Sequence, residues 1–583
     1  MMKVKVIMSL VFCLVLVIST LSGCSGDGTG LEETASDTGG GSQSSTTSVA
    51  EDPNIDLSGK MPIIKDPSKF PKMKMLMVAE PALVRDPNEL IQTKRLNEET
   101  GVVFEWEAIP SEGANEKINL LLSSRDLPDV FWNGINNDIL VQYAEQDVFL
   151  PTEELTEKYV PNLVKIFEER PQYKALATAP NGHRYGFPYI EEMYGLVLTP
   201  GPFMINAEWL DKVGLSMPTT IEEWENALKA FKEAGDLNGN GKNDEVPYAL
   251  GLGSDDIFGS YNTLHQFTAC FGQSDTYGGR MNDHLAIKDD KVIFTAADNA
   301  YKETVKWFHQ LNVEGLIDQD SFSPGTSSSS PLFLNKLKGS EAVIGSFGVW
   351  APVNEIPDPD VYKQYKPLPR LKGPKGSMGH ALNFSEMHFA GYTTITTACK
   401  YPEVVAAWVN HILEPELSIT TNWGPIDYIY VKGDDGKLHF DLNPDGSFKL
   451  KDGFQTFGEM RVNSTPIKGS PIVLNEYYDK YADYTWDAVD LLAAQRVNGK
   501  EEILKEASPV PMMLLDVEEA RTVAQIQPQI KNIVNSYTMQ WILDGNIDET
   551  WEKYKSELEA AGLKEFIATY QQAYNRYLSN IKK

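Results

Sequence analysis

Residues 73–79 are MKMLMVA, a compact apolar run that is typical of a buried β-strand. Residues 88–101 (NELIQTKRLNEETG) follow with helical spacing and a final glycine, and residues 102–109 (VVFEWEAI) predict a second strand. Residues 116–124 (EKINLLLSS) predict a helix, and residues 127–133 (LPDVFWN) a third strand. This alternation predicts an α/β fold with a largely parallel sheet, whose strand ends border a cleft.

A second α/β region follows. Thr220 and Glu223 predict a capping box at the start of a helix that ends at Gly235. The other predicted elements are strands within residues 341–350 and 388–396, and helices over residues 221–234, 402–413 and 551–580, the last interrupted by Gly562. A chain of 583 residues is too long for one core, so we expect two or more lobes.

The net charge of −30 makes nucleic acid and anionic membrane surfaces poor partners. The acidic residues are spread along the chain, which is typical of a solvated surface. The eight histidines are scattered. The sequence contains no G-x-S-x-G, H-E-x-x-H or phosphate-binding G-x-x-x-x-G-K-[ST] motif, which disfavours esterase, metalloprotease and nucleotide-binding functions.

The N-terminus predicts export. Two lysines precede an unbroken apolar run and the segment LSGC at 21–24, so residues 1–23 are predicted to be a signal peptide. The segment LSGC resembles the lipobox of bacterial lipoproteins, in which the cysteine, here Cys24, is lipidated. An ordinary signal peptide with a chance cysteine is the alternative; the apolar run is shorter than the roughly 20 residues of a membrane span. Residues 24–62 are rich in Gly, Ser and Thr and predict a flexible tether.

Two further cysteines, Cys270 and Cys399, stand in apolar surroundings. A disulfide between them is possible, but two buried thiols are the favoured prediction.

Residues 236–245, DLNGNGKNDE, begin with the spacing of a calcium-binding hand, including a glycine at the bend, Gly241. The twelfth position is Pro247, where such a hand needs a bidentate glutamate. Two carboxylates just before it can replace that ligand. An Asx-rich turn without metal is the alternative. The candidate metal ligands are Asp236, Asn238, Asn240, Lys242 through its carbonyl, Asp244 and Glu245.

The chain resembles the extracellular solute-binding lipoproteins of carbohydrate ABC importers in Gram-positive bacteria, and more distantly the alginate-binding proteins. The resemblance extends over nearly all of the chain after the tether. The segments that carry it are LSGC (21–24), LPDVFWN (127–133), RYGFPY (184–189), residues 206–250 around DLNGNGKNDE, and QQAYNRYL (571–578).

The resemblance implies a two-lobe, type II binding-protein fold with a hinge, mixed central sheets flanked by helices, and a helical C-terminus. Lobe 1 would comprise residues 63–195 and 370–428, and lobe 2 residues 196–369 and 429–583. By the same analogy the chain would cross between the lobes near residues 189–198, 365–369 and 427–431. The protein would stand on the outer face of the membrane and deliver an oligosaccharide to a permease. Residues 236–245 would hold a structural Ca²⁺.

A sugar site combines aromatic rings, which stack on the C–H faces of pyranoses, with planar polar groups for the hydroxyls. Loop tryptophans are better candidates than Trp224, Trp408 or Trp551, whose helical spacing predicts core packing. The predicted ligand-binding residues are Trp132, Asn133, Glu192, Tyr194, Trp350, Asn354, Asn383, Phe384, Trp423 and Trp486.

Two other classes remain as alternatives. A secreted glycoside hydrolase would also be acidic and rich in aromatic residues, and would need two carboxylates roughly 5 to 10 Å apart. A carbohydrate-binding surface adhesin would not need two lobes or a hinge. A non-enzymatic binding protein is the main prediction.

Overall fold

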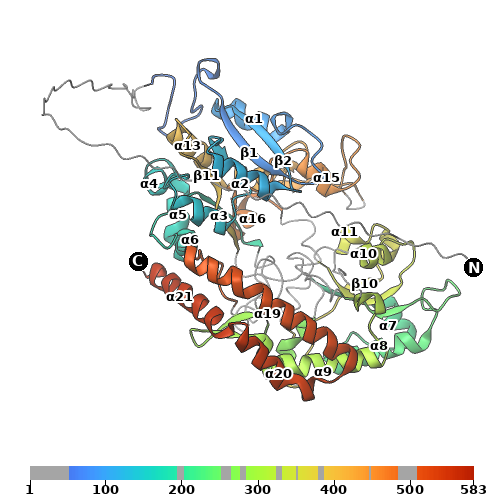
Figure 1. The fold of residues 1–583 in the computed structure, drawn as a ribbon. Helices are drawn as coiled ribbons and strands as arrows, with labels where there is room; N and C mark the ends of the chain where they lie inside the picture. Colours follow the sequence, from blue (N-terminus) through green and yellow to red (C-terminus); the bar gives the residue numbers. More distant parts are fainter. Residues whose placement is uncertain are drawn as a thin grey trace, which may run out of the picture. The chain divides into compact units, whose positions relative to one another are not determined.

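A computed structural model gives the fold (Figure 1). It describes residues 52–193, 202–250, 264–275, 284–322, 331–349, 352–378, 386–444, 448–483 and 509–582. All of these belong to the unit Ser48–Lys583.

The larger sheet contains the first predicted α/β unit. Its strands, in spatial order, are β14 (Ile472–Val473), β4 (Phe187–Glu191), β11 (Met387–Ile395), β3 (Val130–Phe131), β1 (Met73–Ala79) and β2 (Phe104–Pro110). As predicted, β1 pairs in parallel with both β2 and β3. β11 runs antiparallel to β3 and β4. The sheet is therefore mixed, and the carboxyl ends of β1, β2 and β3 lie at one edge.

Among the described residues, ten helices lie next to the strands of this sheet along the chain. The predicted glycine stop is confirmed, because Gly101 ends α1 in the left-handed conformation with φ 68°. The helices are α1 (Ile91–Thr100), α2 (Ala114–Ser124), α3 (Asn137–Ala144), α4 (Glu153–Tyr159), α5 (Pro161–Glu169), α6 (Pro171–Ala177), α13 (Pro402–Ile412), α14 (Pro415–Trp423), α15 (Phe457–Val462) and α16 (Asn475–Tyr481).

A second sheet has the order β10 (Tyr365–Pro367), β5 (Phe203–Asn206), β9 (Ile344–Gly348), β6 (Val246–Tyr248). It is also mixed, since β9 pairs antiparallel with β5 and parallel with β6. Two hairpins are separate: β7 (Leu285–Lys288) with β8 (Lys291–Phe294), and β12 (Tyr430–Lys432) with β13 (Leu438–Phe440). The helices near the second sheet in sequence are α7 (Ala207–Val213), α8 (Ile221–Ala234), α9 (Asn299–Val313), α10 (Pro331–Leu337), α11 (Pro352–Glu355) and α12 (Pro359–Tyr362).

Helix α8 begins almost as predicted. The Thr220 hydroxyl accepts a hydrogen bond from the amide of Glu223, 3.1 Å away. The Glu223 carboxylate accepts from the amide and hydroxyl of Thr219, one residue earlier than the capping box predicts. Short 3₁₀ turns occur at Pro67–Lys69, Pro87–Glu89, Leu264–Phe271, Thr295–Ala297 and Gln319–Phe322.

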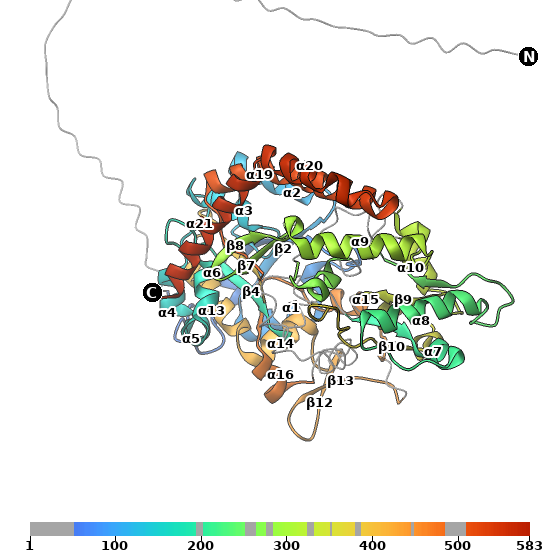
Figure 2. The same cartoon turned by 90° about the horizontal axis from the view of Figure 1, so that it is seen from below.

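The C-terminal region is helical: α19 (Val517–Asp544), α20 (Ile547–Ala560) and α21 (Leu563–Ile581). Both ribbon views show α19 beside α9 (Figures 1 and 2). The predicted break is confirmed, since Gly562 has φ 99° and precedes α21. Trp224, Trp408 and Trp551 are buried, which confirms their predicted core packing.

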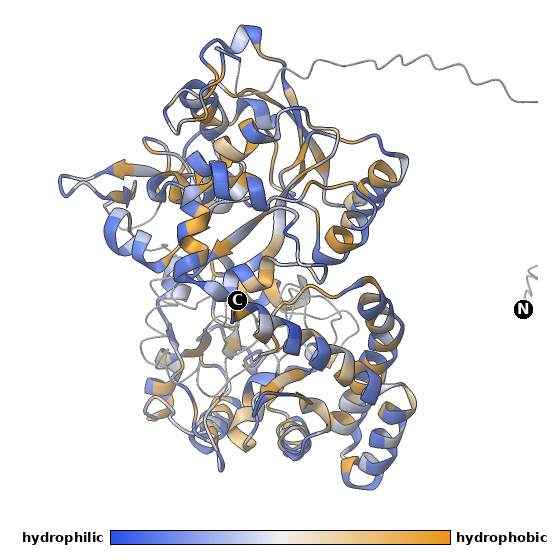
Figure 3. Ribbon diagram, turned by 90° about the vertical axis from the view of Figure 1, so that its left-hand side faces the viewer, coloured by the Kyte–Doolittle hydropathy of each residue, from blue (hydrophilic) through white to orange (hydrophobic). Residues whose placement is uncertain are grey.

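The buried apolar residues form two cores. The first core surrounds the six-stranded sheet and the second core surrounds the four-stranded sheet. Helices with one apolar face pack on these cores, and Figure 3 shows orange and blue residues alternating along the helices. These two cores are the two lobes of the predicted fold.

The lobe boundaries differ from those predicted. Residues 429–483 were assigned to lobe 2, but Tyr430, Ile472 and Tyr478 belong to the first core, and β14 pairs with β4. Leu371 and Met378 belong to the second core, although residues 370–378 were assigned to lobe 1. Pairing between strands almost 300 positions apart leaves no local signal in the sequence, which explains the error.

The chain changes core at three of the gaps between described segments, and Leu514, between Val510 and Val523 of the second core, also packs in the first core. Met193 lies in the first core and Phe203 in the second; Met378 lies in the second and Met387 in the first. The third change falls between Ala482 in the first core and Val510 in the second. The crossings predicted at 365–369 and 427–431 differ from this pattern, because the buried residues on both sides of 365–369 lie in the second core and those on both sides of 427–431 lie in the first core.

The predicted tether ends earlier than residue 62. Ile55 forms a β-bridge with Ile64, and the amide of Asp56 donates to the carbonyl of Ile63, so folded structure begins before residue 56. Cys24 and the signal peptide lie outside the described residues. Cys270 and Cys399 are free, buried thiols in different cores, as favoured by the sequence. Among the described residues, no helix is long and apolar enough to cross a membrane.

Candidate ligand pocket and metal loop

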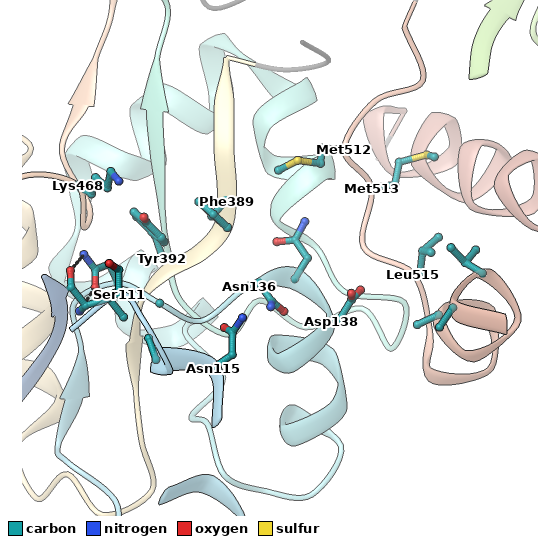
Figure 4. Close-up of a pocket in the computed structure, with 18 of the residues that line it drawn as sticks. Ser111, Asn115, Asn136, Asp138, Phe389, Tyr392, Lys468, Met512, Met513 and Leu515 are labelled. Atoms are coloured by element: carbon teal, nitrogen blue, oxygen red, sulfur yellow. Dashed lines mark hydrogen bonds between the residues drawn. The ribbon is translucent and has the colours of Figure 1, made fainter. Parts of the chain in front are cut away.

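A pocket with a volume of about 720 Å³ lies at the carboxyl ends of β1, β2 and β3 (Figure 4). Its size is that of a small-molecule site, and strand ends are where α/β sheets bind ligands. The loops after these strands supply Glu80, Pro81, Ser111, Asn133, Gly134 and Asn136, and α19 supplies Ala520, Val523, Ala524 and Gln527.

Two aromatic rings from β11 form one wall. Phe389 and Tyr392 stack with centroids 4.3 Å apart and 3° between their planes. The pairing of β11 with β4 shifts register between Phe389 and Thr393, which allows both side chains to lie on one side of the strand. The ring of Tyr189 stacks behind Tyr392, 5.8 Å away. The wall therefore has the form of an aromatic platform.

Polar side chains face this platform from helices α2 and α3. Asn115 and Asp138 point into the pocket, and Asn136 caps α3 by accepting from the amide of Ile139 at 2.9 Å (Figure 4). The Asp138 carboxylate has no hydrogen-bond or ion-pair partner among the described residues. Although it reaches pocket solvent, surrounding protein desolvates it and raises its pKa. Asp138 is therefore a carboxylate available to donors of a ligand.

The remaining lining is neutral overall. Glu80 is paired with Lys468, so these two charges compensate each other. Met512, Met513 and Leu515 form an apolar wall on the side of α19 (Figure 4). The described lining thus combines an aromatic platform, amides, one unpaired carboxylate and an apolar surface.

Of the residues predicted to bind ligand, Asn133 lines this pocket. Its side chain accepts from the amide of Val78 at 2.6 Å and donates to the carbonyl of Val78 at 3.2 Å. It therefore continues the β1–β3 pairing beyond the end of β3 and fixes the pocket floor.

Trp132, predicted to contact ligand, lies in the first core instead. Its side chain has 0% exposure and donates through Nε1 to the carbonyl of Pro466 at 3.0 Å. The ring packs edge-on against Trp106 and Trp408, with centroids 5.5 and 5.6 Å away. The alternation of a strand explains this, because Trp132 and Asn133 point to opposite faces.

Trp423 and Glu192 are also buried rather than in the pocket lining. Trp423 donates to the hydroxyl of Tyr478 at 2.8 Å and lies under the guanidinium of Arg461. Glu192 accepts from Nε of Arg170 at 2.7 Å and from the hydroxyl of Tyr173 at 3.1 Å. Trp423 therefore packs inside the first lobe, and Glu192 is paired with Arg170.

The other predicted ligand residues lie outside the described part of the chain: Tyr194, Trp350, Asn383, Phe384 and Trp486. Asn354 belongs to α11, but its side chain is also outside the described part.

Sequence reasoning missed Asp138, Phe389, Tyr392 and Lys468. The segment NGINND directly after a strand was a signal for Asp138, since polar residues at strand ends face a cleft. The aromatic pair gave no such signal, because its orientation depends on the irregular pairing of β11.

The loop at residues 236–245 is organised by its own side chains. Asp236, Asn238 and Asn240 accept hydrogen bonds from the amides of Gly241, Asn240 and Lys242, at 2.9, 3.0 and 2.8 Å. Gly239 and Gly241 both have φ 81°, which favours glycine. These bonds between side chains and backbone fix the conformation of the loop.

The loop also fits a cation. Oε2 of Glu245 is buried without a hydrogen-bond partner, while Oε1 accepts from the amides of Leu237 and Asn238 at 2.6 and 3.1 Å. A buried, unpartnered carboxylate oxygen is costly unless a ligand pairs with it. Asp244 and Glu341 accept from the side-chain amide of Asn240, and Glu341 is a fourth nearby acid that sequence reasoning missed. Oxygen donors alone match the preference of Ca²⁺.

Two α/β lobes, with a pocket at strand ends that combines aromatic and amide groups, define the solute-binding class of protein. Residues 86–417, more than half of the chain, match the family of bacterial extracellular solute-binding proteins. The chain belongs to this family, as the sequence resemblance predicted.

The chain is similar to FusA of Streptococcus pneumoniae, a fructooligosaccharide ABC transporter substrate-binding protein. The two are 34% identical over 528 residues, which cover 87% of this chain and 91% of FusA. Structures of FusA with kestose, and of an EF-hand mutant with fructo-nystose, each give a TM-score of 0.72 at 31% identity, covering 88% of this chain and 100% of FusA.

Two more distant structures share the fold. One is a solute-binding protein of Bifidobacterium longum infantis, with a TM-score of 0.73 at 22% identity, covering 87% of this chain and 99% of the other. The alginate-binding protein AlgQ2 gives 0.62 at 19% identity, covering 87% and 99%. The two-lobe fold and its relation to alginate-binding proteins agree with the sequence prediction.

Proposed function

We propose that this protein captures a neutral oligosaccharide, of the fructooligosaccharide class, and delivers it to an ABC permease. The observation that carries the proposal is the pocket at the ends of β1, β2 and β3, with its aromatic platform facing Asn115 and Asp138. Stacking rings suit the C–H faces of sugar rings, and amide and carboxylate groups suit their hydroxyls. The similarity to FusA over 87% of the chain supports the same ligand class.

Charge in the pocket supports a neutral ligand. Lys468 is paired with Glu80, and Asp138 adds an uncompensated negative charge. A uronate would bring its carboxylate beside Asp138, where like charges repel in a partly desolvated site.

Transport would rest on lobe closure. A ligand that contacts both lobes only in the closed form stabilises that form by its differential affinity. The permease, a separate partner, would then recognise the closed form. The signal at residues 1–23 would direct export and then be removed, and lipid on Cys24 would hold the protein at the outer face of the membrane.

The loop at 236–245 would hold a structural Ca²⁺ through Asp236, Asn238, Asn240, Lys242, Asp244 and Glu245. The unpartnered Oε2 of Glu245 supports this assignment, as does the existence of an EF-hand mutant of FusA. The ion would neutralise the clustered carboxylates and fix the turn after α8.

A non-enzymatic role agrees with the pocket chemistry. Glycoside hydrolysis needs two cooperating carboxylates. In the described lining the acids are Asp138 and Glu80, and Glu80 is engaged by Lys468.

Calorimetric titration of the purified protein with kestose, nystose and a galacturonan oligomer tests the proposal. We expect saturable binding of the two fructans and none of the galacturonan, while chromatography shows the fructans unchanged. The proposal would be contradicted if neither fructan bound at millimolar concentration, which corresponds to a binding free energy weaker than about −4 kcal/mol. Release of fructose would instead identify a hydrolase.

A further inference from the structure

Three titratable side chains meet inside the second lobe, away from the pocket and the calcium loop. His265 lies in the 3₁₀ segment Leu264–Phe271, Asp275 follows it, and His284 precedes β7. Their exposures are 7%, 3% and 2%. None of the three lines the pocket described above.

The three side chains converge on one carboxylate oxygen. Nδ1 of His265 and Nδ1 of His284 lie 2.8 and 2.9 Å from the same Oδ2 of Asp275. The three ligand atoms all lie within 4.8 Å of one another. Among the described residues this is the one group of three His, Cys, Asp or Glu side chains with such convergence.

The surroundings hold this arrangement in place. The hydroxyl of Thr295 donates to the other Asp275 oxygen, Oδ1, and the amide of Thr295 donates to the carbonyl of His284 at 2.7 Å. Tyr301 stacks on His265, with ring centroids 5.9 Å apart. A residue that orients a ligating carboxylate through its second oxygen is typical of protein metal sites.

The backbone at His284 is also unusual. His284 has φ 52°, a left-handed conformation that non-glycine residues rarely adopt. Such conformations persist where the surrounding structure requires a particular side-chain position. In this conformation Nδ1 of His284 lies 2.9 Å from Oδ2 of Asp275.

We propose that His265, Asp275 and His284 form a binding site for a borderline transition-metal ion such as Zn²⁺. Two imidazole nitrogens and one carboxylate oxygen are donors that Zn²⁺, Ni²⁺ and Co²⁺ prefer and Ca²⁺ does not. The two separations between Nδ1 and Oδ2, 2.8 and 2.9 Å, are short enough for each pair of atoms to bond one ion at about 2.1 Å. The protein would therefore hold two different ions in the second lobe.

Bound metal would link three separate segments of that lobe. The ligands come from positions 265, 275 and 284, and Thr295 adds the segment before α9. A fixed link across these segments stabilises the lobe by mass action, as any ligand specific to the folded state does.

The test begins with purified protein treated with a chelator and then saturated with Ca²⁺, so that the oxygen-rich loop is occupied. Titration with Co²⁺ should give d–d absorption that saturates at one equivalent and is displaced by Zn²⁺. Zn²⁺ should also raise the melting temperature above its value in Ca²⁺ alone. Asp275→Asn and His284→Gln should each abolish both effects.

Matched variants separate this site from others. His439→Gln removes a histidine that lies between two carboxylates outside the cluster, and Asp244→Asn alters the calcium loop. Both variants should retain the Co²⁺ spectrum. Absence of stoichiometric Co²⁺ or Zn²⁺ binding by the wild-type protein, or its persistence in both cluster variants, would overturn the proposal.

Because the cluster is buried, its variants could fail to fold. X-ray absorption of the Zn²⁺-loaded wild-type protein avoids this problem. We expect a first shell with two imidazoles, and a shell of oxygen ligands alone would overturn the assignment.

Discussion

Phe389 and Tyr392 stack face to face, 4.3 Å apart, although they are three positions apart on one strand. A regular strand would direct them to opposite faces of the sheet. The register shift opposite β4 changes this, and Gly186 and Gly391 permit it: a Cβ on Gly186 would lie 2.7 Å from Cα of Gly391. The aromatic platform therefore depends on the close approach of the backbone at Gly186 to the backbone at Gly391.

Replacing either ring should weaken oligosaccharide binding. We expect Phe389→Ala and Tyr392→Ala each to raise the Kd for kestose by about tenfold, equivalent to about 1.4 kcal/mol, because a stacking face is lost. Calorimetry measures the change. Phe457→Ala is the control, since Phe457 stacks on Phe448 at 4.1 Å and does not line the pocket. Equal losses in all three variants would show a structural cause.

Trp132→Ala should act on stability. The substitution removes a fully buried ring and its hydrogen bond to Pro466, so we expect the free energy of unfolding to fall by about 3–5 kcal/mol. Urea denaturation measures this loss. Asn115→Ala, on the pocket wall, should instead lower affinity without lowering stability. A Trp132→Ala protein of unchanged stability with lost kestose binding would reverse the assignment.

Local patterns predicted the elements well. The run 73–79 is β1, the helix after Thr220 begins at its predicted cap, and Gly562 separates the last two helices. These features depend on neighbours in sequence, such as side-chain periodicity, caps and left-handed glycines.

Long-range pairing explains what the sequence could not predict. β14 joins β4 across almost 300 positions, so residues 429–483 were assigned to the wrong lobe. Trp132 and Asn133 are neighbours in sequence, yet one packs in the core and the other lines the pocket. Which face of β3 points to the pocket is decided by strands that lie far away in sequence.

Removing Ca²⁺ should destabilise the protein. Ion binding to the folded state alone contributes about 2.7 kcal/mol at a concentration 100 times the Kd, so a chelator specific for Ca²⁺ should lower the melting temperature by several degrees. Asp236→Asn with Glu245→Gln should abolish the response. Glu341→Gln tests whether that neighbouring acid contributes. A wild-type melting curve that is the same with and without chelator would contradict a structural Ca²⁺.

The β12–β13 hairpin should depend on pH through His439. Its Nε2 lies 3.0 Å from Asp435 and its Nδ1 2.9 Å from Asp483, and the hydrogen bond with Asp435 and the charge of Asp483 raise its pKa. A group with a raised pKa stabilises the fold fully below its unfolded pKa of about 6.5, and this contribution is lost as pH rises through the higher folded value.

We therefore expect the amides of β12 and β13 to lose protection from hydrogen exchange above pH 6.5, after correction for the intrinsic exchange rate. The effect on global stability should be small, because His439 is partly exposed. Protection of these amides should depend on pH in the wild-type protein. It should not depend on pH in His439→Gln, because glutamine does not titrate. A hairpin whose corrected protection is the same at pH 6 and pH 8 would show that the imidazolium does not hold Asp483.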